Sequence, residues 1–433
     1  MRQRLLSVSI AALLLSSAAA RAGDFDWSGF FIGAYGGAGA IVDDLSLPGI
    51  GAGNFNGVGG EGWTGGGLLG FDYRISPMVV VGVQADVGST GLRTSLDIPA
   101  LGGKLVSAEP DLTASASLRL GYLPTPQTLL YLIGGYSYAR YNVDIKGALA
   151  GLLGASDFAQ NYSGFHVGAG IETKLTQNLT GRIEYRYTQY GGEDWGTGGI
   201  LDVAPSTHTV MFGLTWAFLP IGSAVAPTPV RYAKADGSWT GFYLGGYGGA
   251  GAIVDDISLP GIGAGDFNGI GGEGLTGGGL LGFNYQISPR FLVGLQGDVG
   301  ATSLDTELNI PIAGGNLIDA QPDLTASASA RIGFLPTRST LLYVLGGYSY
   351  ARYNVNVGGP LAALLGASDF RQNYNGFHVG AGIETKLTHN LTGRLEYRYA
   401  QYAGQDWGTG GILSVAPSSH TAMVGLSWLI GSR

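Results

Sequence analysis

The stretch THTVMFGLTWAF, residues 207–218, alternates large apolar side chains with small or polar ones. A strand turns successive side chains to opposite faces, so this period of two predicts a β-strand with one apolar face. That face carries Val210, Phe212, Leu214, Trp216 and Phe218, and the other carries Thr209, Met211, Gly213, Thr215 and Ala217. The apolar face suits either lipid or a packed core, and alternation alone does not choose between them.

The composition favours sheet over helix. The 433 residues include 78 glycines, 45% apolar residues and only 12% charged residues, against roughly 25% charged in a typical soluble domain. Glycine at this frequency disfavours long helices, and the apolar content excludes a disordered chain. The absence of cysteine excludes disulfides and thiolate catalysis. A net charge of -8 without a basic patch argues against a nucleic-acid partner.

The N-terminus has the pattern of an export signal. Residues 1–22 combine the basic start MRQR, the apolar run LLSVSIAALLLSSAAA and the small-x-small sequence Ala20-Arg21-Ala22. This predicts a signal peptide cleaved before Gly23. Beyond it no stretch approaches the ~20 apolar residues of a spanning helix. If the rest of the chain crosses a membrane, we expect it to do so with strands.

The chain contains an internal duplication, so the same fold is expected twice. A shift of 212 residues aligns WSGFFIGAYGGAGA at Trp27 with WTGFYLGGYGGAGA at Trp239, and between residues 152–216 and 364–428 only 12 of 65 positions differ. The unmatched stretch 219–238 is rich in Ala and Pro and is typical of a linker. The predicted organisation is a signal peptide at 1–22, a first barrel at 23–218, the linker at 219–238 and a second barrel at 239–433.

Each copy contains eight predicted strands. In the first copy they lie near residues 28–40, 62–74, 78–89, 111–123, 128–143, 162–175, 179–189 and 207–218. Tight turns at 75–77, 124–127 and 176–178 alternate with long loops at 41–61, 90–110, 144–161 and 190–206. Short turns on one rim and long loops on the other are typical of outer-membrane barrels. The predicted fold class is all-β, a transmembrane antiparallel up-and-down barrel.

Aromatic residues near the strand ends support the membrane interpretation over a soluble sandwich. They resemble the two aromatic girdles of a membrane barrel. The predicted interfacial aromatics are Tyr122, Tyr131, Tyr162, Phe165, Tyr187, Tyr190, Trp216, Phe218 and Trp428.

The sequence leaves two barrel architectures open. Two tandem eight-stranded barrels are favoured, because the linker is about twenty residues long, whereas every other connection on the short-turn side of the barrel has three or four residues. Phe218 also stands where a complete barrel would end. The alternative is a single 16-stranded barrel, which would be wide enough for a porin channel.

A ladder of charges lies on the predicted inner face. Arg182, Glu184 and Arg186 alternate along the seventh strand, and a three-residue turn sets Glu172 opposite Arg182 and Lys174 opposite Thr180. The predicted lumen charge network is Glu172, Lys174, Arg182, Glu184, Arg186, Glu384, Lys386, Arg394, Glu396 and Arg398. These ions either pair inside a filled lumen or line a charged pore, and the small barrel favours pairing.

No stretch predicts catalysis, a cofactor or a metal. Residues 60–65 match G-x-G-x-x-G, but no helix follows and glycine is frequent. Two histidines, His166 and His378, are expected to face the lumen. Ser206 with His208, and Ser418 with His420, are the nearest approach to a nucleophile and base at the outer rim, and a rim hydrogen bond is the favoured interpretation.

The sequence resembles the small eight-stranded outer-membrane β-barrels of Gram-negative bacteria, namely the opacity-type and alphaproteobacterial porin-like surface proteins. The matching motifs are W-[ST]-G-F-[FY]-[IL]-G at Trp27 and Trp239, LLGFDYRISP, LLYLIGGYSYAR and LTGRIEYRY, with their second-copy counterparts. The resemblance implies an outer-membrane location and assistance from the barrel-assembly machinery during insertion. Members of that family usually carry one barrel and end in an aromatic residue, whereas this chain ends WLIGSR.

These observations predict a surface and envelope protein without enzymatic activity. The expected function is structural, with outer-membrane lipid as the surrounding partner. A passive diffusion channel formed by one 16-stranded barrel is the first alternative. An adhesin or ligand-binding protein acting through the long extracellular loops is the second, and the sequence names no ligand for it.

Overall fold

The computed structural model describes residues 27–430 except 48–51, 99–102, 148–149, 152–153, 155, 196–200, 219–236, 260–263, 311–314 and 408–412. The predicted signal peptide and nearly all of the predicted linker therefore lie outside the described residues. The strands of the first copy are β1 (Gly29–Leu47), β2 (Ala52–Ser76), β3 (Val79–Thr90), β4 (Arg93–Ile98), β5 (Gly103–Thr125), β6 (Thr128–Ile145), β7 (Asp157–Lys174), β8 (Leu179–Tyr190), β9 (Glu193–Trp195) and β10 (Leu201–Phe218).

The second copy repeats this order of strands, and its described elements include the short helix α2. Its elements are β11 (Gly241–Leu259), β12 (Ala264–Ser288), β13 (Phe291–Thr302), β14 (Thr306–Ile310), β15 (Gly315–Thr337), β16 (Thr340–Val357), α2 (Gly359–Leu365), β17 (Asp369–Lys386), β18 (Leu391–Tyr402), β19 (Gln405–Trp407) and β20 (Leu413–Ile430). Within the described ranges, no helix has the length and apolarity needed to cross a membrane.

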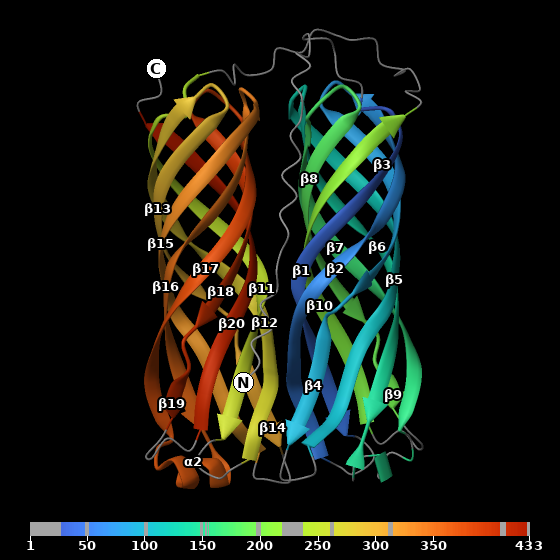
Figure 1. Cartoon of the computed structure of the whole chain (residues 1–433), viewed down its shortest axis with the longest axis vertical. Helices are drawn as coiled ribbons and strands as arrows, with labels where there is room; N and C mark the ends of the chain where they lie inside the picture. Colours follow the sequence, from blue (N-terminus) through green and yellow to red (C-terminus); the bar gives the residue numbers. More distant parts are fainter. Residues whose placement is uncertain are drawn as a thin grey trace.

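Each copy closes on itself as an antiparallel barrel (Figure 1). The first strand β1 pairs with β2 on one side and with the last strand β10 on the other, from Phe30 opposite Phe218 to Ser46 opposite Asp202. In the same way β11 pairs with β12 and with β20. Since β4 pairs with the same neighbours as β3, and β9 with the same neighbour as β8, the wall has eight positions. The structure therefore contains two eight-stranded barrels and not the alternative of one 16-stranded barrel.

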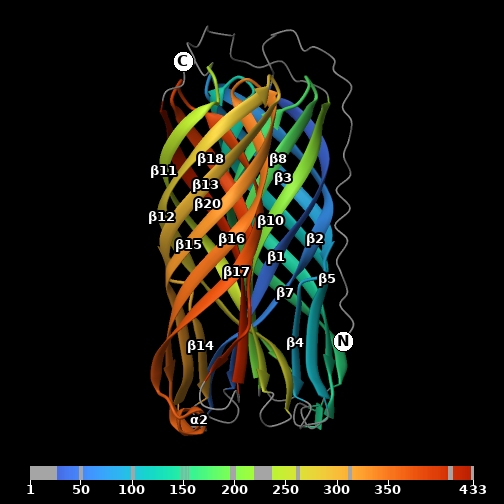
Figure 2. The same ribbon diagram turned by 60° about the vertical axis from the view of Figure 1, so that its left-hand side comes forward.

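The strands are longer than the sequence predicts. Most residues assigned to the long loops continue the hairpins, so that β1 and β2 stay paired as far as Leu47 opposite Ala52. A continued ladder satisfies backbone donors and acceptors that a loop would leave to water. A strand needs about 9–11 residues to cross the membrane, so the outer part of these hairpins extends beyond it, and α2 lies at this end (Figure 2).

The two faces of the wall differ as the alternation predicts. Where the outer face of the wall is not covered by the other barrel, its side chains are large, apolar and exposed. They include Ile32, Leu69, Val83, Leu118, Leu120, Leu132, Val167 and Leu214. The opposite face turns charged and polar residues into the barrel, where they are buried. This arrangement inverts that of a soluble sandwich, which buries its apolar face.

Three of the nine predicted interfacial aromatics face the interior of the barrel and not the membrane. Tyr131, Tyr162 and Tyr190 are buried inside the barrel, at 3%, 0% and 6% exposure. Tyr190 shares its face of β8 with Arg186, so the period of two turns it inward with the charges. Tyr187 faces outward but is half-buried against the second barrel. The other five predicted aromatics are exposed, namely Tyr122, Phe165, Trp216, Phe218 and Trp428.

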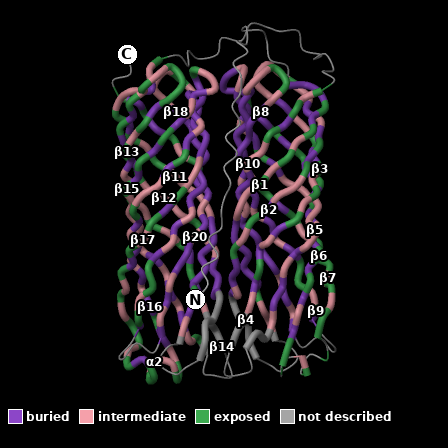
Figure 3. Tube along the Cα trace, in the orientation of Figure 1, coloured by how far each residue is buried: buried purple, intermediate pink, exposed green. Residues whose placement is uncertain are grey.

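The two barrels lie side by side and contact each other along their height (Figures 1 and 3). Equivalent residues meet at both ends. The hydroxyl oxygens Oγ1 of Thr128 and Thr340 are 3.0 Å apart near the short turns, and Val58 pairs with Ile270 near the other end. Contacts between residues 212 positions apart indicate an approximate two-fold relation. Between these points Ile171, Ile183, Val210, Ile383 and Leu395 form a buried apolar cluster.

Candidate functional site: the barrel lumen

The lumen of the first barrel holds a network of paired charges. Glu184, which is fully buried, accepts hydrogen bonds from Arg182 Nη2, from Arg186 Nη2 at 2.7 Å and from the Tyr131 hydroxyl at 2.8 Å. Arg186 also reaches both carboxylate oxygens of Asp86, each at 3.1 Å. The inward face of one strand therefore supplies three alternating charges, and each of them has an ionic partner.

A second group of charges lies next to the first. Glu172 stands opposite Arg182 in the β7–β8 register, as the turn length predicts, but its nearest cation is Arg119, whose Nη2 lies 2.8 Å from Oε2. The Thr180 hydroxyl donates to Glu172 Oε1 at 2.6 Å. Arg119 also approaches Asp72 at 3.7 Å. Asp72, Asp86 and Arg119 were not predicted as members of the network, although each lies on the inward face of its strand.

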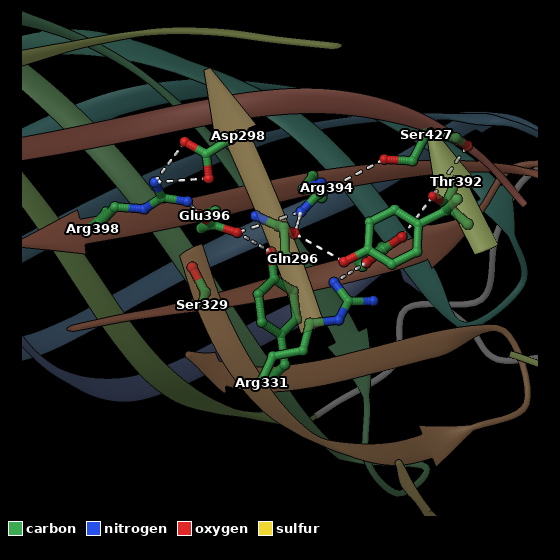
Figure 4. Close-up of polar contacts among 12 residues, drawn as sticks. Gln296, Asp298, Ser329, Arg331, Thr392, Arg394, Glu396, Arg398 and Ser427 are labelled. Atoms are coloured by element: carbon green, nitrogen blue, oxygen red, sulfur yellow. Dashed lines mark hydrogen bonds and ion pairs between the residues drawn. The ribbon is translucent and has the colours of Figure 1, made fainter. Parts of the chain in front are cut away.

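The second barrel repeats most of the network (Figure 4). Arg398 contacts Glu396 at 2.7 Å and Asp298 at 3.0 Å, and Arg394 donates to Gln296 Oε1 at 2.8 Å. Arg331 pairs with Glu384 at 3.1 Å. Asn284 replaces Asp72, and Arg331 Nε donates to its amide oxygen at 2.9 Å. Ser427 replaces Thr215 and accepts from Arg394 Nη2 at 3.0 Å.

The two predicted lysines lie at the short-turn end, next to tryptophan rings. Lys174 Nζ stands 4.6 Å from the ring centroid of Trp27, and Lys386 Nζ stands 5.2 Å from that of Trp239. Lys386 also donates to the carbonyl oxygen of Gly237 at 2.9 Å. Both lysines are buried, and they help to close this end through cation–π contacts.

Apolar clusters close the lumen on both sides of the charges. At the short-turn end of the first barrel the cluster consists of Trp27, Val80, Leu123, Leu129, Tyr131 and Ile133. At the other end it includes Ile41, Leu92, Tyr141, Val143, Tyr162, Tyr190, Trp195 and Val203. In the latter, Tyr141 and Tyr162 meet edge to face with ring centroids 4.9 Å apart. The second barrel has corresponding clusters.

Two small cavities lie among the described lumen residues. One of about 50 Å³ lies beside Tyr35, Asp86 and Arg186, and one of about 60 Å³ lies beside Tyr247, Asp298 and Arg398. A water molecule takes about 30 Å³ of liquid, so each cavity has room for about one or two waters. Neither has the dimensions of a solute channel.

The lumen histidines are held by serine hydroxyls. His166 lies between Ser117 and Ser137, with Nε2 2.9 Å from one Oγ and Nδ1 2.8 Å from the other. His378 has the same relation to Ser329 and Ser349. In the part of the chain that the structure describes, no three His, Asp or Glu residues are grouped as a metal site would require.

The outer-rim Ser–His pairs lie between the barrels and do not face one another as nucleophile and base. Ser206 Oγ donates to Glu273 Oε2 at 2.8 Å, and His208 Nε2 lies 3.0 Å from the same oxygen. In return Ser418 and His420 contact Glu61 Oε2 at 3.1 and 2.9 Å. A serine nucleophile needs its hydroxyl bonded to the base, and here both groups bind the carboxylate instead. Glu61 and Glu273 were not predicted as site residues. They are outward-facing carboxylates on strands that otherwise turn apolar residues and glycine outward.

Comparison with known proteins decides the family. The model of the outer membrane protein beta-barrel domain matches residues 8–218 and again 222–428. This chain belongs to that family. The paired matches follow the duplication, and membership places the protein in the outer membrane. In barrels of this kind the short turns lie on the periplasmic side.

Curated relatives agree with this assignment. The chain is 28% identical over 175 residues to a 25 kDa outer-membrane immunogenic protein of Brucella abortus, covering 40% of this chain and 71% of that protein. It is 30% identical over 180 residues to a 22 kDa outer membrane protein of Rhizobium leguminosarum, covering 40% and 69%. Among solved structures, Neisserial surface protein A is similar at a TM-score of 0.27 and 20% identity, covering 44% of this chain and 98% of that one.

Proposed function

We propose that this protein is a structural component of the outer membrane whose two barrels do not conduct solutes. The observation that carries the proposal is the filled lumen. Paired charges occupy its middle, and an apolar cluster closes it at each end. An eight-stranded barrel has room for little more than its own side chains. A channel would need these buried charges to face water, and they face one another.

The absence of enzymatic activity is part of the same proposal. The outer-rim serines and histidines bind glutamates of the opposite barrel, so that they join the two barrels. The charges of the lumen are enclosed, where a substrate has no access to them. Neither arrangement provides an activated nucleophile beside an open cleft.

Conductance of the full-length protein tests the proposal. We expect no steady single-channel current in planar bilayers and no sugar-driven swelling of liposomes that contain the protein. As a matched comparison, the double variant Tyr141→Ala, Tyr162→Ala removes two rings from the outer apolar cluster of the first barrel. The proposal would be refuted if the wild-type protein carries an ohmic current and the ion selectivity of that current is different in the variant Glu184→Gln. Such a result would show a charged pore.

A second candidate function is binding of an extracellular partner by the extended hairpins. It is favoured by the length of these hairpins beyond the membrane and by exposed ion pairs on their outer faces, such as Arg140–Asp111 at 2.6 Å and Arg352–Asp323 at 2.7 Å. A relative named as immunogenic supports placing this end at the cell surface. An epitope tag inserted after Gly366 should be bound by antibody on intact cells. Lack of labelling, with labelling after permeabilisation, would contradict this orientation.

A further inference from the structure

An apolar groove of about 640 Å³ lies between the two barrels, toward the short turns. One wall comes from β1, β8 and β10, and the other from β13, β15, β16 and β17. Its volume falls within the roughly 300–1,000 Å³ of ligand pockets in proteins. Representative lining residues are Ile183, Phe212 and Leu214 of the first barrel, and Phe334, Leu342 and Val344 of the second.

The walls of the groove are made from surface that belongs in hydrocarbon. Leu214 and Val344 are 44% and 55% exposed and lie on the outward faces of their strands. The groove ends at Leu175 and Phe291, next to the short turns, so it opens at the level of the periplasmic leaflet. An apolar space of this kind does not hold water. A hydrocarbon chain from the surrounding leaflet has the matching chemistry.

Two arginines lie in the short turns beside strands that line the groove. Arg290 directly precedes the lining residue Phe291, and its carbonyl oxygen accepts from Leu335 N at 2.8 Å, next to Phe334. Arg338 lies in the following turn, where its carbonyl oxygen accepts from Trp239 Nε1 at 3.0 Å. Both arginine residues are exposed.

The two arginines occur in the second copy alone. The equivalent positions of the first copy are Met78 and Pro126. The sequence difference therefore places two arginines in turns beside this groove, whereas the corresponding turns of the first barrel have only Arg74, whose guanidinium donates to the carbonyl oxygens of Ser76 and Pro77 within its own turn. Guanidinium groups bind phosphate through paired, charge-assisted hydrogen bonds.

We propose that the groove binds one phospholipid of the periplasmic leaflet. An acyl chain lies between the barrels against the apolar walls, and the phosphate lies at the membrane surface beside Arg290 and Arg338. The lipid fills the space that the side-by-side contact leaves open, so it is a bound component of the pair of barrels.

Native mass spectrometry of the full-length protein tests this proposal. The probe is palmitoyl-oleoyl-phosphatidylglycerol, titrated into protein that has been delipidated in detergent. We expect one lipid to bind well above the background of non-specific adducts. The double variant Arg290→Met, Arg338→Gln should weaken that binding at least tenfold. The matched control Arg371→Met removes an exposed arginine from the extracellular end and should bind as the wild type does.

A second variant tests the hydrocarbon contact. Ala34→Phe with Ala381→Phe places two rings in the groove, and it should lose the bound lipid while retaining heat-modifiable migration of a closed barrel. Val83→Phe, on the outward face of β3, is the control. Equal binding by the wild type and the arginine variant would overturn the proposal, even if the groove-filling variant loses the lipid. Equal binding by the groove-filling variant would overturn it as well.

Discussion

Replacement of Glu184 by glutamine tests whether the lumen is a filled, paired interior or a hydrated pore. Glu184 is fully buried and accepts from Arg182, Arg186 and Tyr131. Glutamine keeps the shape and one acceptor oxygen but removes the negative charge. Arg186 would then keep Asp86, whereas Arg182 would keep the neutral Gln84 Oε1 at 2.8 Å.

The expected loss follows from the uncompensated charge of Arg182. Its other neighbouring carboxylate, Glu172, is already paired with Arg119 at 2.8 Å. Breaking a buried ion pair in this way costs about 3–5 kcal/mol. At about 1.4 kcal/mol for each factor of ten, Glu184→Gln should lower the folding equilibrium constant by about two to nearly four orders of magnitude.

Urea unfolding in phospholipid vesicles measures this loss through heat-modifiable migration and tryptophan fluorescence. Asp111→Asn is the matched control, because it breaks an ion pair with Arg140 in which both side chains are about one-third to one-half exposed. Exposed pairs contribute about 0–1 kcal/mol. If Glu184→Gln costs no more than Asp111→Asn, the lumen charges are solvated and the reasoning for a filled interior fails.

Three other predictions concern the extracellular end and the contact between the barrels. Burial raises the pKa of Asp43 and of Asp255, each to about 7, and both lie in the outer part of their strands, beyond the roughly 9–11 residues that cross the membrane. The folded state therefore favours the protonated form of both carboxyls, so the free energy of unfolding should rise as the pH falls from about 8 to about 4. The double variant Asp43→Asn, Asp255→Asn should flatten the dependence of the urea midpoint on pH. The double variant Thr128→Cys, Thr340→Cys should form a disulfide within the chain, seen as faster non-reduced migration, because the two hydroxyl oxygens are 3.0 Å apart. The control Val87→Cys, Val299→Cys, on exposed outward faces, should form no disulfide. Failure of the first pair to cross-link would contradict the side-by-side contact of the barrels. Glu61→Gln with Glu273→Gln weakens the hydrogen bonds from the rim serines and histidines, and it should slow that cross-linking severalfold; an unchanged rate would mean that the rim contacts do not hold the barrels together.

The local pattern of the sequence determined the class of fold. Alternation over 207–218 requires an extended strand with one apolar face, and this property depends on neighbouring residues alone. The duplication could be read by direct comparison of the copies. The turn length between β7 and β8 set Glu172 opposite Arg182, because register across a tight hairpin is local as well.

Tertiary structure decided which residues meet across the barrel. Glu172 is opposite Arg182 in sequence register but binds Arg119, which reaches it from β5 through closure of the barrel. Tyr131 was assigned to the membrane surface because it lies near a strand end. Both faces of β6 carry large apolar residues, so the alternation does not show which face is inward. Closure turns Tyr131 toward Glu184.

The contact between the barrels was also beyond the reach of the sequence. Glu61 and His420 are 359 positions apart, and they come together only when two closed barrels stand side by side. The pattern of one strand records whether a side chain faces inward or outward. It does not record what covers the outward face, because lipid and a second barrel select the same apolar residues; only the assembled structure separates the two.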